Sequence, residues 1–259
     1  MIEVYRVDLT KEKLEAMPPK ERQLLLLLGH AANEINVLQK LIKMTTPGNS
    51  GLAFVSHAET GQSFILVRVL IGKLHEAWEL FKNRFQSESD INSKYVPKLS
   101  TEAANATDSL KKYFGKNKAL TDIRKCLSFH YSDKKNLIEK SFQEISGDDK
   151  LKFYLSEKPE NSFYHASERV VLGSIIGLTM TEQGDGESHI DYCGRAIGDI
   201  LDQTIDVSRQ IMVLFEQCIT EIFSEYFPDV DCGNPIGAFS PPSLSSIHIP
   251  FFFDPDATR

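Results

Sequence analysis

Apolar residues recur every three or four positions along several stretches of the chain, the spacing that gives a helix one buried face. These stretches are residues 20–44, 56–85, 102–114, 118–145 with a junction near Tyr131, 166–180 and 190–227. Helix-breaking residues separate them, such as Pro47 and Gly48, and Ser56 followed by Glu59 predicts a capping box at the start of the second long helix. The pattern predicts a mainly α fold, a bundle of long helices.

Three parts of the chain depart from the helical period. Ile2 and Val4 alternate with polar residues and predict a short edge strand. Segments 151–155 and 161–165 are rich in aromatic residues and flank a turn that contains Pro159, which predicts a short β-hairpin insertion. After Pro228 the chain holds five more prolines and no helical period, so we expect an irregular Pro-rich C-terminal tail.

These elements predict an order of parts along the chain, with a polar stretch at 86–104 that ends in a loop containing Pro97. The parts are an N-terminal arm (1–19), a helical bundle (20–146), a hairpin insertion (147–165), C-terminal helices packing on the bundle (166–227) and a Pro-rich tail (228–259).

Composition and charge narrow the classes of function. Hydrophobic residues make up 41% and charged residues 25%, as in ordinary globular proteins. The net charge of −7 argues against a duplex-DNA binder, because phosphate neutralisation supplies much of such a protein's affinity. No apolar run is long enough to span a membrane and the N-terminus lacks the layout of a secretory signal, so we expect a cytoplasmic protein with no membrane partner and no DNA partner.

The most distinctive string, at 123–133, reads Ile-Arg-Lys-Cys-Leu-Ser-Phe-His-Tyr-Ser-Asp and falls at the junction of two predicted helices. Its Arg124 and His130 suit phosphodiester cleavage without a metal, because His moves protons near neutral pH and Arg stabilises charge on a phosphate. On an ideal helix the two side chains point roughly 120° apart. They therefore converge only where the helix ends or bends between them, or where two copies combine.

This string resembles the signature of the HEPN superfamily (higher eukaryote and prokaryote nucleotide-binding domains), an Arg followed after four to six residues by a His. The helices over 20–145 are similar to those of bacterial abortive-infection-like members. The resemblance implies an α-helical homodimer with a composite site and a metal-independent endoribonuclease of a defence or toxin system. It implies Arg124 and His130 as the catalytic residues, RNA and an antitoxin or other protein as partners, and no cofactor or metal.

A catalytically inactive helical dimerisation or interaction module is the main alternative. In the family the position after the arginine is commonly Asn or Asp, whereas here it is Lys125. That departure and the acidic net charge favour the alternative. A small-ligand or nucleotide sensor is a third hypothesis, although the chain has no Gly-rich phosphate loop of the P-loop type.

Other candidate groups have simpler interpretations. Arg68 and His75 repeat the Arg/His spacing inside a predicted helix, where an ordinary surface or interface pair is expected. His30 lies one helical turn before Glu34, but the Glu-x-x-His spacing of a di-iron bundle is absent and we expect no metal site. Cys126 is expected to be a buried helix cysteine.

The three consecutive phenylalanines 251–253 stand near the C-terminus of the chain. They are interpreted as a plug that docks the tail onto the protein, with a partner-binding strip as the alternative, because contiguous apolar residues on a surface mark interaction sites.

Overall fold

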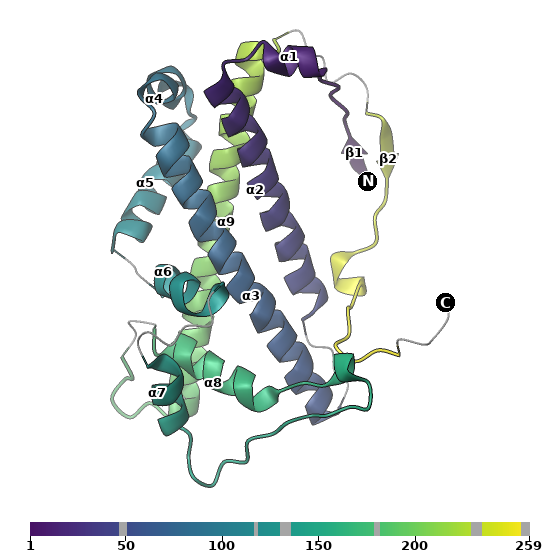
Figure 1. Cartoon of the computed structure of the whole chain (residues 1–259), viewed down its shortest axis with the longest axis vertical. Helices are drawn as coiled ribbons and strands as arrows, with labels where there is room; N and C mark the ends of the chain where they lie inside the picture. Colours follow the sequence, from purple (N-terminus) through teal and green to yellow (C-terminus); the bar gives the residue numbers. More distant parts are fainter. Residues whose placement is uncertain (47–50, 117–118, 130–135, 179–181, 229–234, 255–259) are drawn as a thin grey trace. The chain divides into compact units, whose positions relative to one another are not determined.

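A computed structural model of the chain (Figure 1) describes residues 1–46, 51–116, 119–129, 136–178, 182–228 and 235–254. The α-helices are α1 (Lys11–Glu15), α2 (Pro19–Met44), α3 (Ala53–Phe81), α4 (Ser89–Tyr95), α5 (Thr101–Lys116), α6 (Ala119–Ile123), α7 (Leu137–Gln143), α8 (His165–Ile176) and α9 (His189–Tyr226). Short π-helical turns follow α3 (Lys82–Gln86) and α6 (Arg124–Ser128), and 3-10 turns lie at Val96–Lys98, Pro159–Asn161 and Leu244–Ser246. The predicted mainly α fold is confirmed.

The extended structure in the described residues is small. Strands β1 (Ile2–Val4) and β2 (Gly237–Phe239) pair antiparallel, with Glu3 opposite Ala238, and lie side by side near the N-terminus in Figure 1. The predicted hairpin is present as one antiparallel bridge, in which Tyr154 and Phe163 exchange backbone hydrogen bonds of 2.9 and 2.7 Å. The N-terminal strand is thus confirmed, and the hairpin is reduced to its central pair.

Two local predictions are corrected. Helix α3 begins at Ala53, and Ser56 donates its backbone N–H to the Leu52 carbonyl, so Ser56 lies inside the helix and the capping box is wrong. The polar stretch at 86–104, in which no helix was predicted before residue 102, contains helix α4. The buried residues of α4 are Ile91 and Tyr95, which lie one helical turn apart. Two apolar positions are too few to reveal a helical period in a polar sequence.

Contacts group the described residues into two compact units, and α2, α3 and α9 each contribute residues to both. The first unit comprises Met1–Asn36, Lys73–Lys116 and Asp206–Ser246, and the second comprises Val37–Gly72, Asn117–Ile205 and Ile247–Arg259. No helix among the described residues is long and apolar enough to cross a membrane.

Aromatic packing forms much of the core of the first unit. Trp78 of α3 stacks on Phe114 of α5 with ring centroids 5.5 Å apart, and Phe81 stacks on Phe85 at 4.9 Å. Helix α9 adds residues such as Phe215, which is fully buried. Burying each such ring removes a large apolar area from water, which stabilises the unit.

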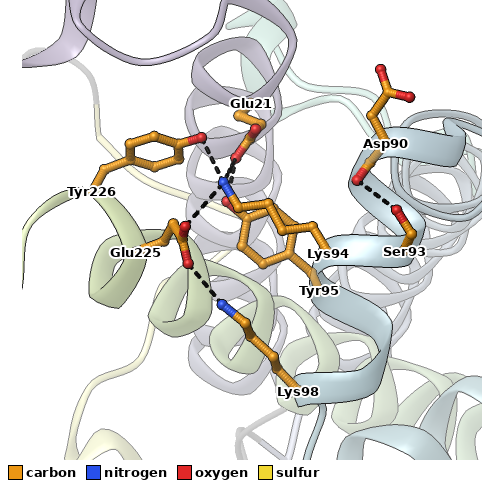
Figure 2. A network of polar contacts seen from close by, with 8 residues as sticks. All are labelled: Glu21, Asp90, Ser93, Lys94, Tyr95, Lys98, Glu225 and Tyr226. Atoms are coloured by element: carbon orange, nitrogen blue, oxygen red, sulfur yellow. Dashed lines mark hydrogen bonds and ion pairs between the residues drawn. The ribbon is translucent and has the colours of Figure 1, made fainter.

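A network of polar side chains ties α4 to α2 and α9 within this unit (Figure 2). The hydroxyl of the fully buried Tyr95 donates to the carboxylate of Glu21. Lys94 donates to the same carboxylate at 3.3 Å and to the hydroxyl of Tyr226 at 2.8 Å. Burial alone would lower the pKa of Lys94, but these hydrogen bonds outweigh it and raise the pKa above its ordinary value.

The outer edge of this network carries a second acidic residue. Glu225 of α9 forms ion pairs with Lys94 at 3.3 Å and with Lys98 at 2.7 Å. Hydrogen bonds from Lys98 and Lys94 lower the pKa of Glu225. The charges of the two carboxylates and the two ammonium groups cancel. We therefore interpret the network as a set of structural contacts that join α4 to α2 and α9.

Small and polar residues allow close packing of α7 on α8 in the second unit. Ser141 of α7 donates to the carbonyl of Val170 at 2.8 Å, and Ser174 of α8 donates to the carbonyl of Leu137 at 3.0 Å. Gly173 leaves the space that this approach requires, because a Cβ there would lie 2.1 Å from the Ser141 hydroxyl. The next two residues of α8, Ser174 and Ile175, are also buried.

Candidate functional site

Arg124 occupies the first position of the π-helical turn that continues α6. Helix α6 buries Leu120 and Ile123, which fixes the side of the helix that faces the core of the second unit. Arg124 is half-buried, Lys125 is exposed and Cys126 is buried as predicted. A π-helical turn inside or after an α-helix is frequent at functional sites, and here it begins at the predicted arginine.

The helix ends between the two residues of the predicted motif. The Ser128 hydroxyl donates to the carbonyl of Ile123 at 3.3 Å, so a side chain caps the π-helical turn. Phe129 then leaves helical geometry with φ −120° and ψ −2°. The requirement that the helix end between Arg124 and His130 is therefore met.

Phe129 is held on α3 by a close approach to Gly72. A Cβ at Gly72 would lie 2.4 Å from Cε2 of the Phe129 ring, so the absence of a side chain at position 72 creates the space for that ring. His130 lies outside the described residues, and its pairing with Arg124 stays a prediction. Phe129, the residue immediately before His130, packs on α3 at Gly72.

The second Arg/His match has structural partners. Arg68 is 9% exposed and donates to both carboxylate oxygens of Glu168, at 2.8 and 3.4 Å, a two-point ion pair inside the second unit. His75 and Phe114 are arranged edge to face in the first unit, with centroids 5.8 Å apart. Both residues therefore have structural roles, but Arg68 is buried and paired with Glu168 and does not lie on the surface.

Lysines pair with Glu34, the carboxylate considered above as a metal ligand, and with Glu79 of α3. Glu34 accepts from Lys73 at 2.6 Å and lies 3.7 Å from His30. Glu79 accepts from Lys82 at 2.6 Å. Among the described residues, no three His, Cys, Asp or Glu side chains come together as a metal site would require.

A pair of histidines that the sequence analysis did not single out lines a cavity of about 130 Å³ in the second unit. The rings of His57 and His165 stack with centroids 4.3 Å apart, and Nδ1 of His57 lies 2.6 Å from the hydroxyl of Tyr154. Nδ1 of His165 is buried and has no hydrogen-bond partner within the described part of the chain. Burial, followed by the positive charge of Lys152, lowers the pKa of His57, and burial lowers that of His165.

These histidines would not have been found from spacing. His57 stands near the start of α3 and His165 opens α8, and no local pattern connects two residues so far apart in the chain. The stacked rings are in van der Waals contact, so no substrate fits between them, and they suit an acid-sensitive packing contact better than a catalytic pair.

The C-terminal phenylalanines dock onto the second unit. Phe251 and Phe163 are arranged edge to face with centroids 5.1 Å apart, and Phe252 and Phe54 are arranged in the same way at 5.4 Å. Phe253 remains exposed. Two of the three rings therefore act as the predicted plug.

Three comparisons with known proteins were made. A scan against models of protein families, a search of curated proteins and a search of solved structures each find no match to this chain.

Proposed function

We propose that the chain is a HEPN-like, metal-independent endoribonuclease of a defence or toxin system, acting as a cytoplasmic homodimer with Arg124 and His130 at its site. The observation that carries the proposal is the helix end between these two residues: a π-helical turn begins at Arg124 and the chain leaves the helix at Phe129. An uninterrupted helix would hold the two side chains roughly 120° apart.

In the proposed reaction the 2′-hydroxyl of RNA loses its proton to His130 and attacks the adjacent phosphorus. The bond from phosphorus to the 5′-oxygen breaks, and that oxygen takes a proton from the protonated imidazole of the second copy. The products are a 2′,3′-cyclic phosphate and a 5′-hydroxyl. The guanidinium of Arg124 neutralises the charge that develops on the non-bridging oxygens.

The test is cleavage of RNA by purified protein in excess chelator, with product ends identified by phosphatase treatment and mass spectrometry. We expect Arg124→Ala and His130→Ala each to lower the cleavage rate by about 100-fold or more. The matched control is Arg209→Ala on α9, which removes an exposed guanidinium that is 69% accessible and paired only with Asp206 in the ion pairs of the described residues. Unchanged cleavage in the two site variants, with melting temperatures like the parent's, would remove the assignment.

A second candidate function, the catalytically inactive interaction module, is favoured by an exposed apolar surface on the hairpin. Phe153 is 56% and Leu155 74% exposed, and Phe153 meets the exposed Tyr164 edge-on with centroids 6.3 Å apart. Clustered exposed apolar side chains mark association surfaces.

Light scattering separates this candidate from the first. If the hairpin surface makes the dimer, Leu155→Glu yields a monomer, whereas Val96→Glu, which changes an exposed valine after α4, leaves the mass unchanged. A dimer that forms through the hairpin and cuts no RNA supports the interaction module alone.

A further inference from the structure

Residues 247–254, here called the C-terminal strap, cross the second unit in an irregular conformation and are anchored at both ends. At the first end, Nε2 of His248 lies 2.9 Å from a carboxylate oxygen of Glu59, whose side chain is only 4% exposed. The next residue, Ile249, donates its backbone N–H to the carbonyl of Met44 at 2.8 Å.

The other end of the strap is held by Asn161. Its amide donates to the carbonyl of Phe253 at 2.7 Å and accepts the Phe253 backbone N–H at 3.0 Å, so one buried side chain satisfies both backbone groups of the strap residue. Lys158 adds an ion pair of 3.0 Å to Asp254. Specific contacts in this number are typical of an ordered part of the fold and not of a flexible terminus.

A cavity of about 590 Å³ lies between the strap and the helices α2 and α3. Its walls are mainly apolar and come from Leu41, Ile65 and Leu66 on the helices and from Ile249 and Phe251 on the strap. Cavities of roughly 300–1,000 Å³ with apolar walls and a few polar groups are the usual form of small-molecule sites.

Three polar residues line the same cavity, and two of them, Gln62 and Glu160, favour a ligand group that donates hydrogen bonds. The side-chain oxygen of Gln62 is buried and accepts no hydrogen bond from the residues that the structure describes, which is costly unless a ligand donates to it. The hydroxyl of Thr45 is already committed to the Leu41 carbonyl at 3.0 Å. Glu160 places an exposed carboxylate on the wall.

We propose that this cavity binds an apolar molecule that carries an ammonium group. The ammonium donates to the Gln62 oxygen and is attracted by the Glu160 carboxylate and by the face of Phe251 or Phe253, while the apolar body fills the space between the strap and the helices. A carboxylate head group is disfavoured, because it would meet the Glu160 charge and offer the Gln62 oxygen no donor. The site is separate from Arg124, and its ligand is independent of the proposed ribonuclease activity.

The experiment is isothermal titration of the full chain with three ten-carbon probes, decylamine, 1-decanol and decanoate, each below its micelle concentration at pH 7. We expect saturable one-site binding of decylamine, weaker binding of decanol, and binding of decanoate at least about tenfold weaker than that of the amine. Gln62→Leu removes the acceptor and should weaken decylamine binding by about tenfold. Glu160→Gln should lower the preference for the amine over the alcohol by about threefold, as expected of an exposed charge.

Ile65→Trp fills the cavity from α3 and should abolish binding of decylamine, while Ile205→Trp, at an exposed isoleucine of α9, should leave it unchanged. A melting curve and circular dichroism spectrum for each variant verify the fold, and Gln62→Leu provides the test if Ile65→Trp does not fold. The proposal is overturned if decylamine shows no saturable binding, if decanoate binds as tightly, or if a folded Ile65→Trp or Gln62→Leu variant keeps the parent affinity. Any of these results leaves the RNA-cleavage proposal standing, since that assay depends on Arg124 and His130.

Discussion

The ring of Phe129 lies so close to the backbone of Gly72 that a methyl group at position 72 would be 2.4 Å from Cε2 and 2.6 Å from Cζ of the ring. Phe129 is the residue at which the chain leaves the π-helical turn, and it directly precedes His130. We therefore expect Gly72 to be a positioning residue for the predicted catalytic histidine, acting through the ring of Phe129.

Gly72→Ala should displace Phe129 and lower RNA cleavage more than it lowers the folded fraction. Overpacking lowers the stability of the fold by about 1–3 kcal/mol, and the better helix propensity of alanine offsets up to about 1 kcal/mol of that loss. We expect a net loss of about 1–2 kcal/mol in the free energy of unfolding, measured by urea denaturation. The rate constant for bound RNA should fall by more than the KM changes, because a displaced His130 is misaligned for proton transfer.

Gly29→Ala on α2 is the matched control, because a Cβ at Gly29 meets nothing within 4 Å. This variant should stabilise the protein by about 0.5–1 kcal/mol and leave cleavage unchanged. Equal cleavage by the Gly72 variant and the parent would show that the ring contact does not position the site.

The buried hydroxyl of Tyr95 predicts a second measurable effect. Tyr95→Phe leaves the carboxylate of Glu21 without its buried donor, and we expect a loss of about 1–3 kcal/mol in the free energy of unfolding. Lys98→Ala leaves the Tyr95–Glu21 hydrogen bond in place and removes the partly exposed ion pair with Glu225 and a cation–π contact 5.6 Å from the centre of the Tyr95 ring, so it should cost about 1 kcal/mol or less. Equal losses for both variants in urea denaturation would contradict the view of Tyr95 as the centre of the network.

The long helices could be predicted because their signal is local and repeated. Apolar residues at three- and four-residue spacing place α2, α3 and α9 to within a few residues of their observed ends. The same pattern predicted a helix junction at the Arg124 string, and the structure ends α6 and its π-helical turn there. The π-helical turn itself could not be predicted, because a shift of the hydrogen bonds from i+4 to i+5 leaves no mark in the apolar period.

Contacts between distant segments account for most of what the sequence analysis missed. Glu59 was interpreted as a capping residue, although its partner His248 lies 189 positions later in the chain. The buried pair of Tyr95 and Glu21 is separated by 74 positions, and α4 was hidden by its polar neighbours. Such pairings depend on tertiary packing, which overrides local propensity.

The stacked histidines make stability depend on pH. Burial lowers the pKa of both His57 and His165 below the ordinary value of 6.5, and the positive charges of Lys152 and Arg169 act in the same direction on His165. Below pH 6.5 the unfolded chain binds protons that the folded chain excludes, so the free energy of unfolding falls as the pH drops through 6.5 toward the folded pKa values. The melting temperature should therefore be lower at pH 5.5 than at pH 7.5.

His165→Phe removes one of the two groups while keeping an aromatic ring on His57. It should reduce the loss of melting temperature between pH 7.5 and 5.5 by roughly half, because one titrating histidine remains. His189→Phe, at an exposed histidine of α9, should keep the full loss. The same pH profile for the parent and His165→Phe would exclude this pair as its source.

The strap depends on Asn161 more than on its surface ion pair. Asn161→Ala removes both hydrogen bonds to the backbone of Phe253, leaving two backbone groups without their buried partner. Amide hydrogen exchange of residues 249–253 should accelerate by about tenfold or more, while exchange in α5 of the first unit stays unchanged. Lys158→Ala, which breaks the partly exposed ion pair with Asp254, should change exchange in the strap by less than about fivefold. If the two variants exchange alike, the aromatic contacts of Phe251 and Phe252 hold the strap, and Phe251→Ala rather than Asn161→Ala should then release it.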